Sequence, residues 1–203
     1  MSKQSALSQL NQEWSQKDLP LKSVATQAVP GEGNPDADIL FIGEAPGKNE
    51  DLQGRPFVGA AGKLLDELIN SIGYQREDIF IANVIKHRPP GNRDPLPEEI
   101  EAYTPWLEKQ LEIINPKIFV TLGRFSMNFM LGPGFSISKI HGEPKRRNGK
   151  VIFPVYHPAA ALYRRNWQPI LMADFQKIPK ILQLIDSEQE SSNPDSTLQS
   201  SLF

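Results

Sequence analysis

The sequence predicts an α/β fold, a three-layer α/β/α sandwich with a central four-stranded parallel sheet. Four short apolar runs are typical of buried parallel strands. Segments with apolar residues at helical spacing separate these runs, and loops rich in Gly and Pro follow them. At 203 residues the chain is long enough for one domain with a substantial core.

The first half of the chain contains two expected strands and two expected helices. Residues 38–43 form an apolar run closed by a glycine, and residues 78–83 form a second run that ends in an asparagine. Between them, residues 59–72 carry leucines and isoleucines at helical spacing. Residues 97–114 open with proline and acidic side chains and stop before Pro116, as expected of a helix.

The second half contains two more strands and two more helices by the same criteria. The expected strands span residues 117–123 and 150–156, and the expected helices span residues 124–131 and 169–185. From Ser187 onward, apolar residues are almost absent until the last few positions. We therefore expect one domain over residues 1–186 and a disordered tail over residues 187–203.

The composition excludes several kinds of site. The chain has no cysteine, which rules out disulfides, thiolate metal sites and cysteine nucleophiles. It has no apolar run that could span a bilayer, and its N-terminus lacks the apolar segment of a signal peptide, so we expect a cytoplasmic protein. The net charge of −2 does not indicate a nucleic-acid binder, although basic residues can still gather on one face.

The loops after the expected strands carry the most unusual residues of the chain. Residues 43–47 read Gly-Glu-Ala-Pro-Gly, and residues 54–59 read Gly-Arg-Pro-Phe-Val-Gly. Residues 83–93 follow the second strand, and residues 157–162 follow the fourth. Each loop alone has a structural alternative, namely a turn, a cap for a strand end or a histidine with an internal partner. Because the carboxyl ends of parallel strands meet at one edge of a sheet, the loops together predict a functional site there.

These motifs, in this order and spacing, resemble those of the family 4 uracil-DNA glycosylases. The resemblance covers about residues 19–180 and rests on four segments, GEGNPDADILFIGEAPG, GRPFVGAAGKLLD, NVIKHRPPGNR and YHPAAAL. It implies a four-stranded parallel sheet between helices. It also implies a monofunctional enzyme that hydrolyses the N-glycosidic bond of uracil in DNA, initiates base-excision repair and needs no metal for cleavage.

The resemblance places a uracil pocket at the predicted edge of the sheet. The expected pocket residues are Gly43, Glu44, Ala45, Phe57, Asn83 and His157. Phe57 matches the ring that stacks on the flipped base, and Asn83 matches the amide that reads O4 and N3–H. His157 matches the histidine that donates to O2 of the departing base. Glu44 is expected to position or activate the attacking water, with bracing of its loop as the alternative.

One departure from the family's pattern is large. The family carries four cysteines that hold a [4Fe–4S] cluster, and here their positions are taken by Gln16, Leu19, His87 and Tyr103. Only His87 could replace a thiolate ligand. We therefore expect no cluster and no other cofactor, and we expect Leu19 and Tyr103 to fill the vacated space.

Contacts with DNA are expected from basic and exposed residues near the pocket. The expected DNA-binding residues are Lys86, Arg88, Arg93, Leu162, Tyr163, Arg164 and Arg165. The basic side chains would neutralise phosphates, and Leu162 or Tyr163 would occupy the space that the flipped base leaves. A further basic run, residues 145–147, is expected in a turn, where its charges could be merely solvated.

The sequence also suggests a protein partner. The residues Gln199-Ser-Ser-Leu202-Phe203 resemble the short peptide by which bacterial repair proteins bind the sliding clamp. A chance match is the alternative, because short motifs are frequent. The chain itself is expected to be a monomer.

Two other functions remain open at this point. The missing cysteines could mark a non-catalytic member of the superfamily that binds DNA or a repair partner. A more distant alternative is an enzyme that acts on another damaged base, such as hypoxanthine. Cleavage of a uracil-containing oligonucleotide distinguishes the enzyme from the binding protein.

Overall fold

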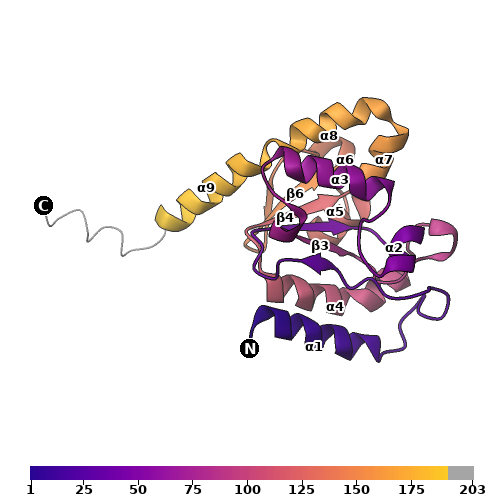
Figure 1. Cartoon of the computed structure of the whole chain (residues 1–203). Coiled ribbons are helices and arrows are strands. Elements are labelled where there is room, and N and C mark those ends of the chain that lie inside the picture. The colour runs from indigo at the N-terminus through magenta and orange to yellow at the C-terminus, as the bar shows by residue number, and fades with distance from the viewer. Residues whose placement is uncertain (192–203) are drawn as a thin grey trace, which may run out of the picture.

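The computed structural model describes residues 1–191, which form three layers (Figure 1). A sheet lies in the middle, and helices cover both of its faces. Within the described residues, no helix has the length and hydropathy that crossing a membrane requires.

The sheet has six strands in the order β1-β3-β2-β4-β6-β5. Their bounds are Glu32–Gly33 (β1), Ile39–Gly43 (β2), Phe80–Asn83 (β3), Ile118–Leu122 (β4), Lys145–Arg147 (β5) and Lys150–Val155 (β6). Strands β3, β2, β4 and β6 are parallel, whereas β1 and β5 pair antiparallel at the two edges. The sheet is therefore mixed: its four central strands are parallel, but the prediction of a sheet made of four parallel strands alone has to be corrected.

The two edge strands that the sequence analysis did not predict, β1 and β5, differ in sequence from the four central strands. Strand β1 is too short to show any alternation of apolar and polar residues. Strand β5 consists of Lys145, Arg146 and Arg147, which the sequence analysis placed in a turn. An edge strand pairs on one side only and can carry charged residues on an exposed face. Lys145 contacts Glu143, and Arg146 contacts Glu188, so ion pairs engage part of this basic run.

Alternate residues of the central strands face opposite helical layers. Leu40 and Ile42 of β2 pack against helices α1 (Lys3–Ser15), α4 (Pro97–Ile114) and α5 (Arg124–Leu131). Ile39 and Phe41 face the other layer. That layer is built from α3 (Ala60–Ser71), α7 (Pro158–Tyr163), α8 (Gln168–Phe175) and α9 (Ile178–Ser191). Shorter helices α2 (Lys48–Gln53) and α6 (Ile137–Ile140), with 3-10 turns at 76–78, 90–92 and 165–167, complete the described fold.

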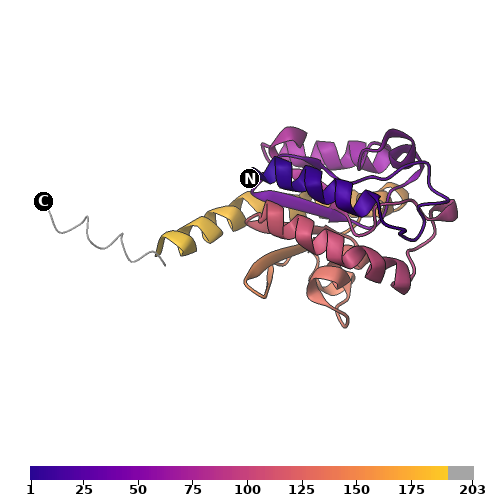
Figure 2. The same cartoon turned by 90° about the horizontal axis from the view of Figure 1, so that it is seen from below.

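Helix α1 was not among the helices that the sequence analysis expected. It lies beside α4 in both views (Figures 1 and 2). Leu7, Leu10 and Trp14 are buried, and their helical spacing aligns them on one face. The Ser2 Oγ accepts a hydrogen bond of 3.2 Å from the Ser5 backbone N–H and caps the helix.

The last expected helix, over residues 169–185, consists of two helices. Helix α8 ends at Phe175 and α9 begins at Ile178, with a two-residue turn at 176–177 between them. Helix α9 continues to Ser191, past the expected start of the tail at residue 187. The predicted clamp peptide, with Gln199, Leu202 and Phe203, lies outside the described residues.

Candidate active site

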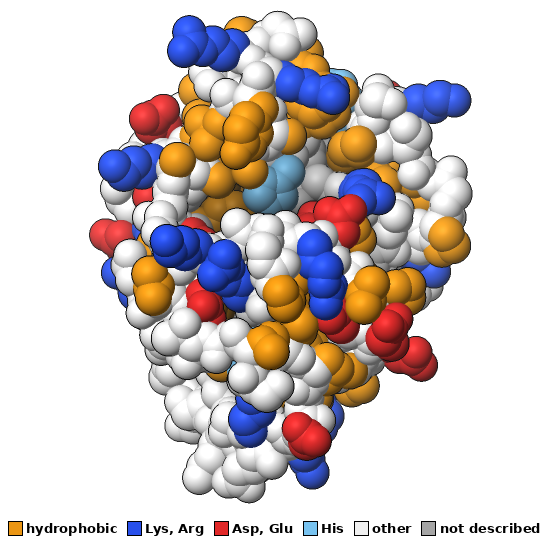
Figure 3. Space-filling view, turned by 90° about the vertical axis from the view of Figure 1, so that its right-hand side faces the viewer, with side chains coloured by type: hydrophobic (Ala, Val, Ile, Leu, Met, Phe, Trp, Pro, Cys, Tyr) orange, Lys and Arg blue, Asp and Glu red, His pale blue; other side chains and the backbone are white. Residues whose placement is uncertain are grey.

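A pocket of about 440 Å³ opens at the carboxyl ends of the parallel strands. Figure 3 shows it as a hollow with a histidine ring at its centre, an acidic side chain beside the ring, and hydrophobic and basic side chains farther around. Five of the six predicted uracil-pocket residues line it, namely Glu44, Ala45, Phe57, Asn83 and His157. Its volume is in the range of pockets that enclose small ligands. The structure thus brings together residues from loops far apart in the sequence.

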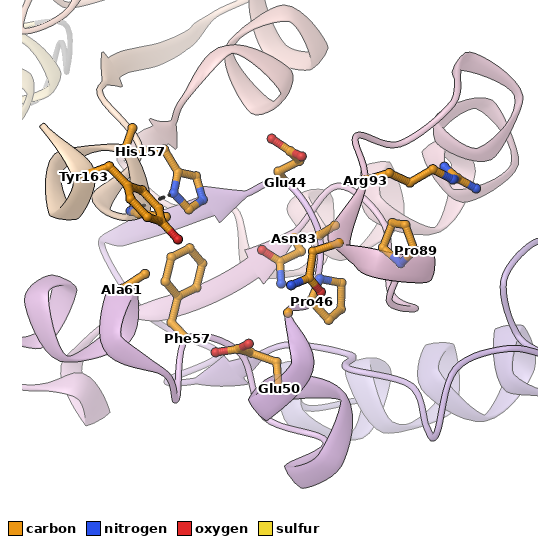
Figure 4. Close-up of a pocket in the computed structure, with 15 residues that line it drawn as sticks. Glu44, Pro46, Glu50, Phe57, Ala61, Asn83, Pro89, Arg93, His157 and Tyr163 are labelled. Carbon is orange, nitrogen blue, oxygen red and sulfur yellow. Dashed lines mark hydrogen bonds between the residues drawn. The ribbon is translucent and has the colours of Figure 1, made fainter.

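Asn83 lies at the end of β3 with 2% of its surface exposed. Its Oδ1 is buried and has no hydrogen-bond partner among the described residues. Nearly all buried polar atoms in proteins are paired, so an unpaired acceptor in a pocket indicates a place for a ligand's donor. Figure 4 shows the amide between Glu44, Phe57 and Pro46.

Gly43, the remaining predicted pocket residue, is required by close packing beneath the pocket. A Cβ atom at this position would lie 2.3 Å from Asn83 Oδ1 and 2.6 Å from the ring of Phe57. Both distances are far shorter than non-bonded contacts allow. Any larger residue at position 43 would therefore displace the amide or the aromatic ring.

Phe57 contributes an aromatic wall to the pocket and is 6% exposed. Its φ of 51° is unusual for a residue other than glycine, so its loop needs support. Glu50 supplies part of it, because its Oε1 accepts hydrogen bonds of 2.9 Å from the backbone N–H groups of Val58 and Gly59. Arg76 donates to the Phe57 carbonyl at 3.1 Å. Arg76 and Glu50 thus hold the backbone at Phe57 and at the two residues after it, and this fixes the position of the ring.

Sequence reasoning missed Glu50 and Arg76, which hold the Phe57 loop. Glu50 follows the Gly-Pro loop and looks like an ordinary acidic residue of a helical first turn. Arg76 lies in a 3-10 turn far from the motifs, beside Glu32 and Asp66. Neither belongs to a recognisable local pattern, because each acts through loop backbone that only the tertiary fold brings near.

His157 begins helix α7 and stands across the pocket from Asn83 (Figure 4). Its Nδ1 accepts a hydrogen bond of 3.1 Å from the Ala159 backbone N–H. In the neutral ring the proton is therefore on Nε2, which is left as a donor. Burial lowers the pKa of His157 to about 4, although Glu50 opposes the shift, so the ring is neutral at physiological pH. The rings of Phe57 and His157 stack with centroids 5.7 Å apart.

Glu44 follows β2 directly, and its carboxyl group lies at the pocket wall (Figure 4). Burial raises the pKa of this carboxyl to about 7, and the negative charge of Asp94 adds to the shift. The positive charge of Arg124 opposes it. A carboxyl group with a pKa near neutrality can accept a proton at physiological pH.

The predicted DNA-binding residues divide into exposed, paired and buried groups. Tyr163, which is 90% exposed, lines the pocket mouth, and Leu162 beside it is 37% exposed. Arg164 and Arg165 are exposed after α7, and the Arg164 guanidinium lies 4.4 Å from the ring centroid of Trp167. Of these four residues, Tyr163 lines the pocket, and the other three are its neighbours in the chain at the end of α7 and just after it.

Two of the predicted arginines are engaged within the protein. Arg93 lines the pocket and forms a bidentate pair with Glu99, with distances of 2.9 and 2.5 Å. Arg88 is half-buried and donates to Asn92 Oδ1 at 2.6 Å. A phosphate would have to compete with these partners or share the guanidinium groups.

The prediction that Lys86 binds DNA is wrong. Its side chain is 1% exposed and points into the protein, where it donates to Gln110 Oε1 at 2.7 Å. It also donates to the backbone carbonyl of Asn83 at 2.9 Å. A side chain without solvent access cannot reach a phosphate.

Comparisons with known proteins agree on one family. The family model described as the uracil DNA glycosylase superfamily matches residues 30–182. A type-4 uracil-DNA glycosylase of Sulfurisphaera tokodaii is 51% identical over 174 residues, which cover 81% of this chain and 79% of that protein. The chain belongs to the type-4 uracil-DNA glycosylases.

Two further relatives of the same type extend this similarity. The enzyme of Archaeoglobus fulgidus is 48% identical over 79% of this chain and 85% of its own length. The enzyme of Thermotoga maritima is 46% identical over 78% of this chain and 84% of its own length. The region that the family model matches, residues 30–182, includes every residue that lines the pocket.

The four positions that the sequence analysis matched to cluster cysteines make other contacts in the structure. Gln16 follows α1 as its C-cap, and Leu19 packs against the core. His87 Nδ1 lies 2.5 Å from the Tyr103 hydroxyl, which donates to the Pro20 carbonyl at 2.6 Å. Within the described residues, no group of three or more His, Cys, Asp and Glu side chains could hold a metal. The donors at these positions therefore do not fit an iron–sulfur cluster.

Replacing Tyr103 with Phe is expected to destabilise the protein by about 1–3 kcal/mol. Tyr103 is fully buried, and the change leaves both His87 Nδ1 and the Pro20 carbonyl without their partner. Chemical denaturation measures the effect. Tyr163→Phe is the control, because that side chain is 90% exposed. Equal stability of the two variants would show that the hydroxyl contributes nothing to the fold.

Proposed function

We propose that the chain removes uracil from DNA as a monofunctional hydrolase and uses the described pocket to do so. The observation that carries the assignment of the pocket is the buried, unpaired Oδ1 of Asn83 between an aromatic wall and a neutral histidine. A pyrimidine with an N–H group at this depth would supply the missing donor. Because the pocket is too deep for a stacked base, the nucleotide has to flip out of the helix.

The proposed recognition of uracil rests on the polarity of one amide. Asn83 Oδ1 accepts a hydrogen bond from N3–H of uracil, and its amide N–H donates to O4. Cytosine has an acceptor at N3 and an amino group at C4, so it reverses both requirements. Phe57 stacks on the base and fixes its plane.

The proposed cleavage places water at C1′ while the bond from C1′ to N1 of uracil breaks. The bonding electrons leave with the base, and negative charge develops on it, including O2. The Nε2–H of His157 donates to O2 and stabilises this charge more in the transition state than in the ground state. Glu44 accepts the proton of the water as the oxygen bonds to C1′. The departing uracil anion then takes up a proton from solvent, and Glu44 releases its proton, so the products are uracil and an abasic site.

Incubation with oligonucleotides that differ at a single base tests this proposal. The purified protein is given uracil, cytosine, thymine or hypoxanthine in the same sequence, and alkali then cleaves any abasic site. Release is expected from the uracil substrate. An intact uracil oligonucleotide after prolonged incubation with excess folded protein would support the DNA-binding alternative, and preferential release of hypoxanthine would support another lesion.

The proposed role of Glu44 predicts a pH dependence. The value of kcat/KM should rise with pH up to about 7 and then level off, because only the carboxylate form accepts a proton. At pH 5 it should be about one hundredth of the plateau value, as the ionised fraction falls tenfold per pH unit. His157 is neutral over this range, since its pKa is about 4.

The control for this pH dependence is Glu44→Gln, which should be slow and lack the rising limb near pH 7. Uracil cleavage over pH 5–9 with a single buffer mixture gives both profiles. A wild-type profile without a limb near pH 7 would remove Glu44 from the proton transfer. The same follows if the limb persists in the variant.

We also propose that the enzyme works without an iron–sulfur cluster. The proposal is supported by the absence of cysteine from the sequence and by the hydrogen bonds that already occupy His87 and Tyr103. A thiolate-free set with one imidazole is a poor ligand set for such a cluster. The contact of Tyr103 with Pro20 holds the segment after α1 against α4 instead.

DNA is the proposed macromolecular substrate, with Leu162, Tyr163, Arg164 and Arg165 as its principal contacts beside the pocket. A sliding clamp remains a proposal from the sequence alone, through Gln199, Leu202 and Phe203. Binding of the clamp to the full chain and to a chain shortened after Thr197 would test it.

A further inference from the structure

Lys86 is a buried amine without an acidic partner among the described residues. It is 1% exposed, and its Nζ contacts two neutral oxygens, Gln110 Oε1 at 2.7 Å and the Asn83 carbonyl at 2.9 Å. Burial lowers the pKa of Lys86 to about 7. Burying an amine is costly, and an apolar side chain of similar length would fill the space without that cost. Packing alone therefore does not explain a lysine here.

The contacts of Lys86 form a chain of hydrogen bonds that ends beneath the pocket. Gln110 belongs to α4, is 2% exposed and donates from Nε2 to the Pro30 carbonyl at 2.8 Å. Its Oε1 accepts from Lys86, and Lys86 donates to the carbonyl of Asn83. The Lys86 amine thus connects α4 by hydrogen bonds to the last residue of β3.

The peptide that Lys86 holds also orients the side chain of Asn83. Asn83 is the last residue of β3, and beyond it the backbone N–H groups of Val84 and Ile85 donate to the carbonyls of Gly43 and Glu44. The Asn83 side-chain Oδ1 has no partner in the described structure. The direction of the amide therefore depends on its packing beside Gly43 and Phe57 and on the backbone of Asn83, whose carbonyl accepts a hydrogen bond from Lys86.

We propose that Lys86 is a positioning residue for uracil recognition, which acts by fixing the Asn83 peptide so that the amide faces the base. The proposal rests on the proposed role of Asn83. Lys86 touches neither the base nor DNA. Small displacements of a recognising group lower the rate strongly, so loss of this bond should weaken recognition of uracil while leaving DNA binding intact.

Lys86→Met tests the proposal, because methionine keeps an unbranched side chain and removes the donors. Two affinities are measured, the inhibition constant of free uracil and the dissociation constant of DNA that contains an abasic-site analogue. We expect the inhibition constant to rise about tenfold and the single-turnover rate to fall about tenfold. The affinity for abasic DNA should stay within about twofold, since such DNA has no base for Asn83 to contact. A general loss of structure would weaken both ligands equally and would overturn the proposal.

Asn83→Ala, alone and combined with Lys86→Met, shows which of the two proposed roles is wrong if a test fails. If Asn83→Ala leaves the inhibition constant of uracil unchanged, the proposed role of Asn83 fails, and the role of Lys86 fails with it. If Asn83→Ala raises the constant and Lys86→Met does not, only the Lys86 proposal is overturned. In the Asn83→Ala background, Lys86→Met should have no further effect on uracil affinity. An additive effect would show that Lys86 does not act through Asn83.

If Lys86→Met does not fold, Gln110→Met tests the proposed role of Lys86 instead. This change removes the second acceptor of Lys86 and its connection to α4 while leaving the lysine in place. The inhibition constant of uracil is then expected to rise about threefold or more, without a change in affinity for abasic DNA. An unchanged inhibition constant in folded Gln110→Met overturns the proposal.

Discussion

Replacing His157 with Ala is expected to lower the single-turnover rate of uracil excision by on the order of a hundredfold or more. The Ala159 N–H occupies Nδ1, so Nε2–H is the donor that the ring offers to the pocket. Alanine removes this donor from the place where charge develops on O2. Excess enzyme and rapid quenching measure the chemical step without interference from product release.

His157→Asn separates cleavage from the second role of the residue. His157 also caps α7, and asparagine is a good N-cap residue but too short to replace the donor. We expect the Asn variant to melt close to the wild-type temperature and still to show the loss in rate. A normal rate in the Asn variant would mean that the histidine matters only for the helix, and the assignment of the donor would be wrong.

Asn83→Asp is the second change with a large expected effect. The carboxylate cannot donate to O4, and its negative charge lies beside a base that itself gains negative charge during cleavage. We expect the rate with uracil to fall on the order of a hundredfold or more. The rate is measured at pH 8 so that the new carboxyl group is ionised.

Asn92→Asp is a matched control for this change. Asn92 lines the same pocket, and its substitution is the same change from amide to carboxylate. Unlike Asn83, it is exposed, and its Oδ1 accepts a hydrogen bond from Arg88. Its substitution should alter the rate by only a few fold, in line with an exposed charge that water screens. Equal losses at positions 83 and 92 would indicate a general effect of charge and would contradict specific recognition by Asn83.

The middle of the fold was predictable because its elements bury residues in regular patterns. Strand β4 and helix α5 were expected within one residue of their observed ends, since each consists of an apolar run or a helical pattern next to glycine. The break between α8 and α9 could not be seen, because apolar residues continue on both sides of Gln176. Helix α1 was missed although Leu7, Leu10 and Trp14 gave a usable signal.

The site residues were predictable where they follow the ends of parallel strands. They were less predictable where tertiary contacts determine whether a side chain is buried. Asn83 ends β3, and Glu44 and His157 follow β2 and β6, so the parallel sheet brings all three to one edge. Lys86 was misplaced because a lysine next to other basic residues looks exposed in sequence, whereas α4 covers it in the fold. The sequence does not reveal which lysine of a basic cluster is buried.

The most direct test of the account measures iron and uracil excision in the same sample. Freshly purified protein, before and after anaerobic incubation with iron and sulfide, is assayed for metal content, visible absorption and single-turnover cleavage in EDTA. We predict far less than one iron per chain, no broad visible band and full cleavage of the uracil substrate. About four iron atoms per chain, with cleavage lost when they are removed, would contradict the claim that this glycosylase works without a cluster.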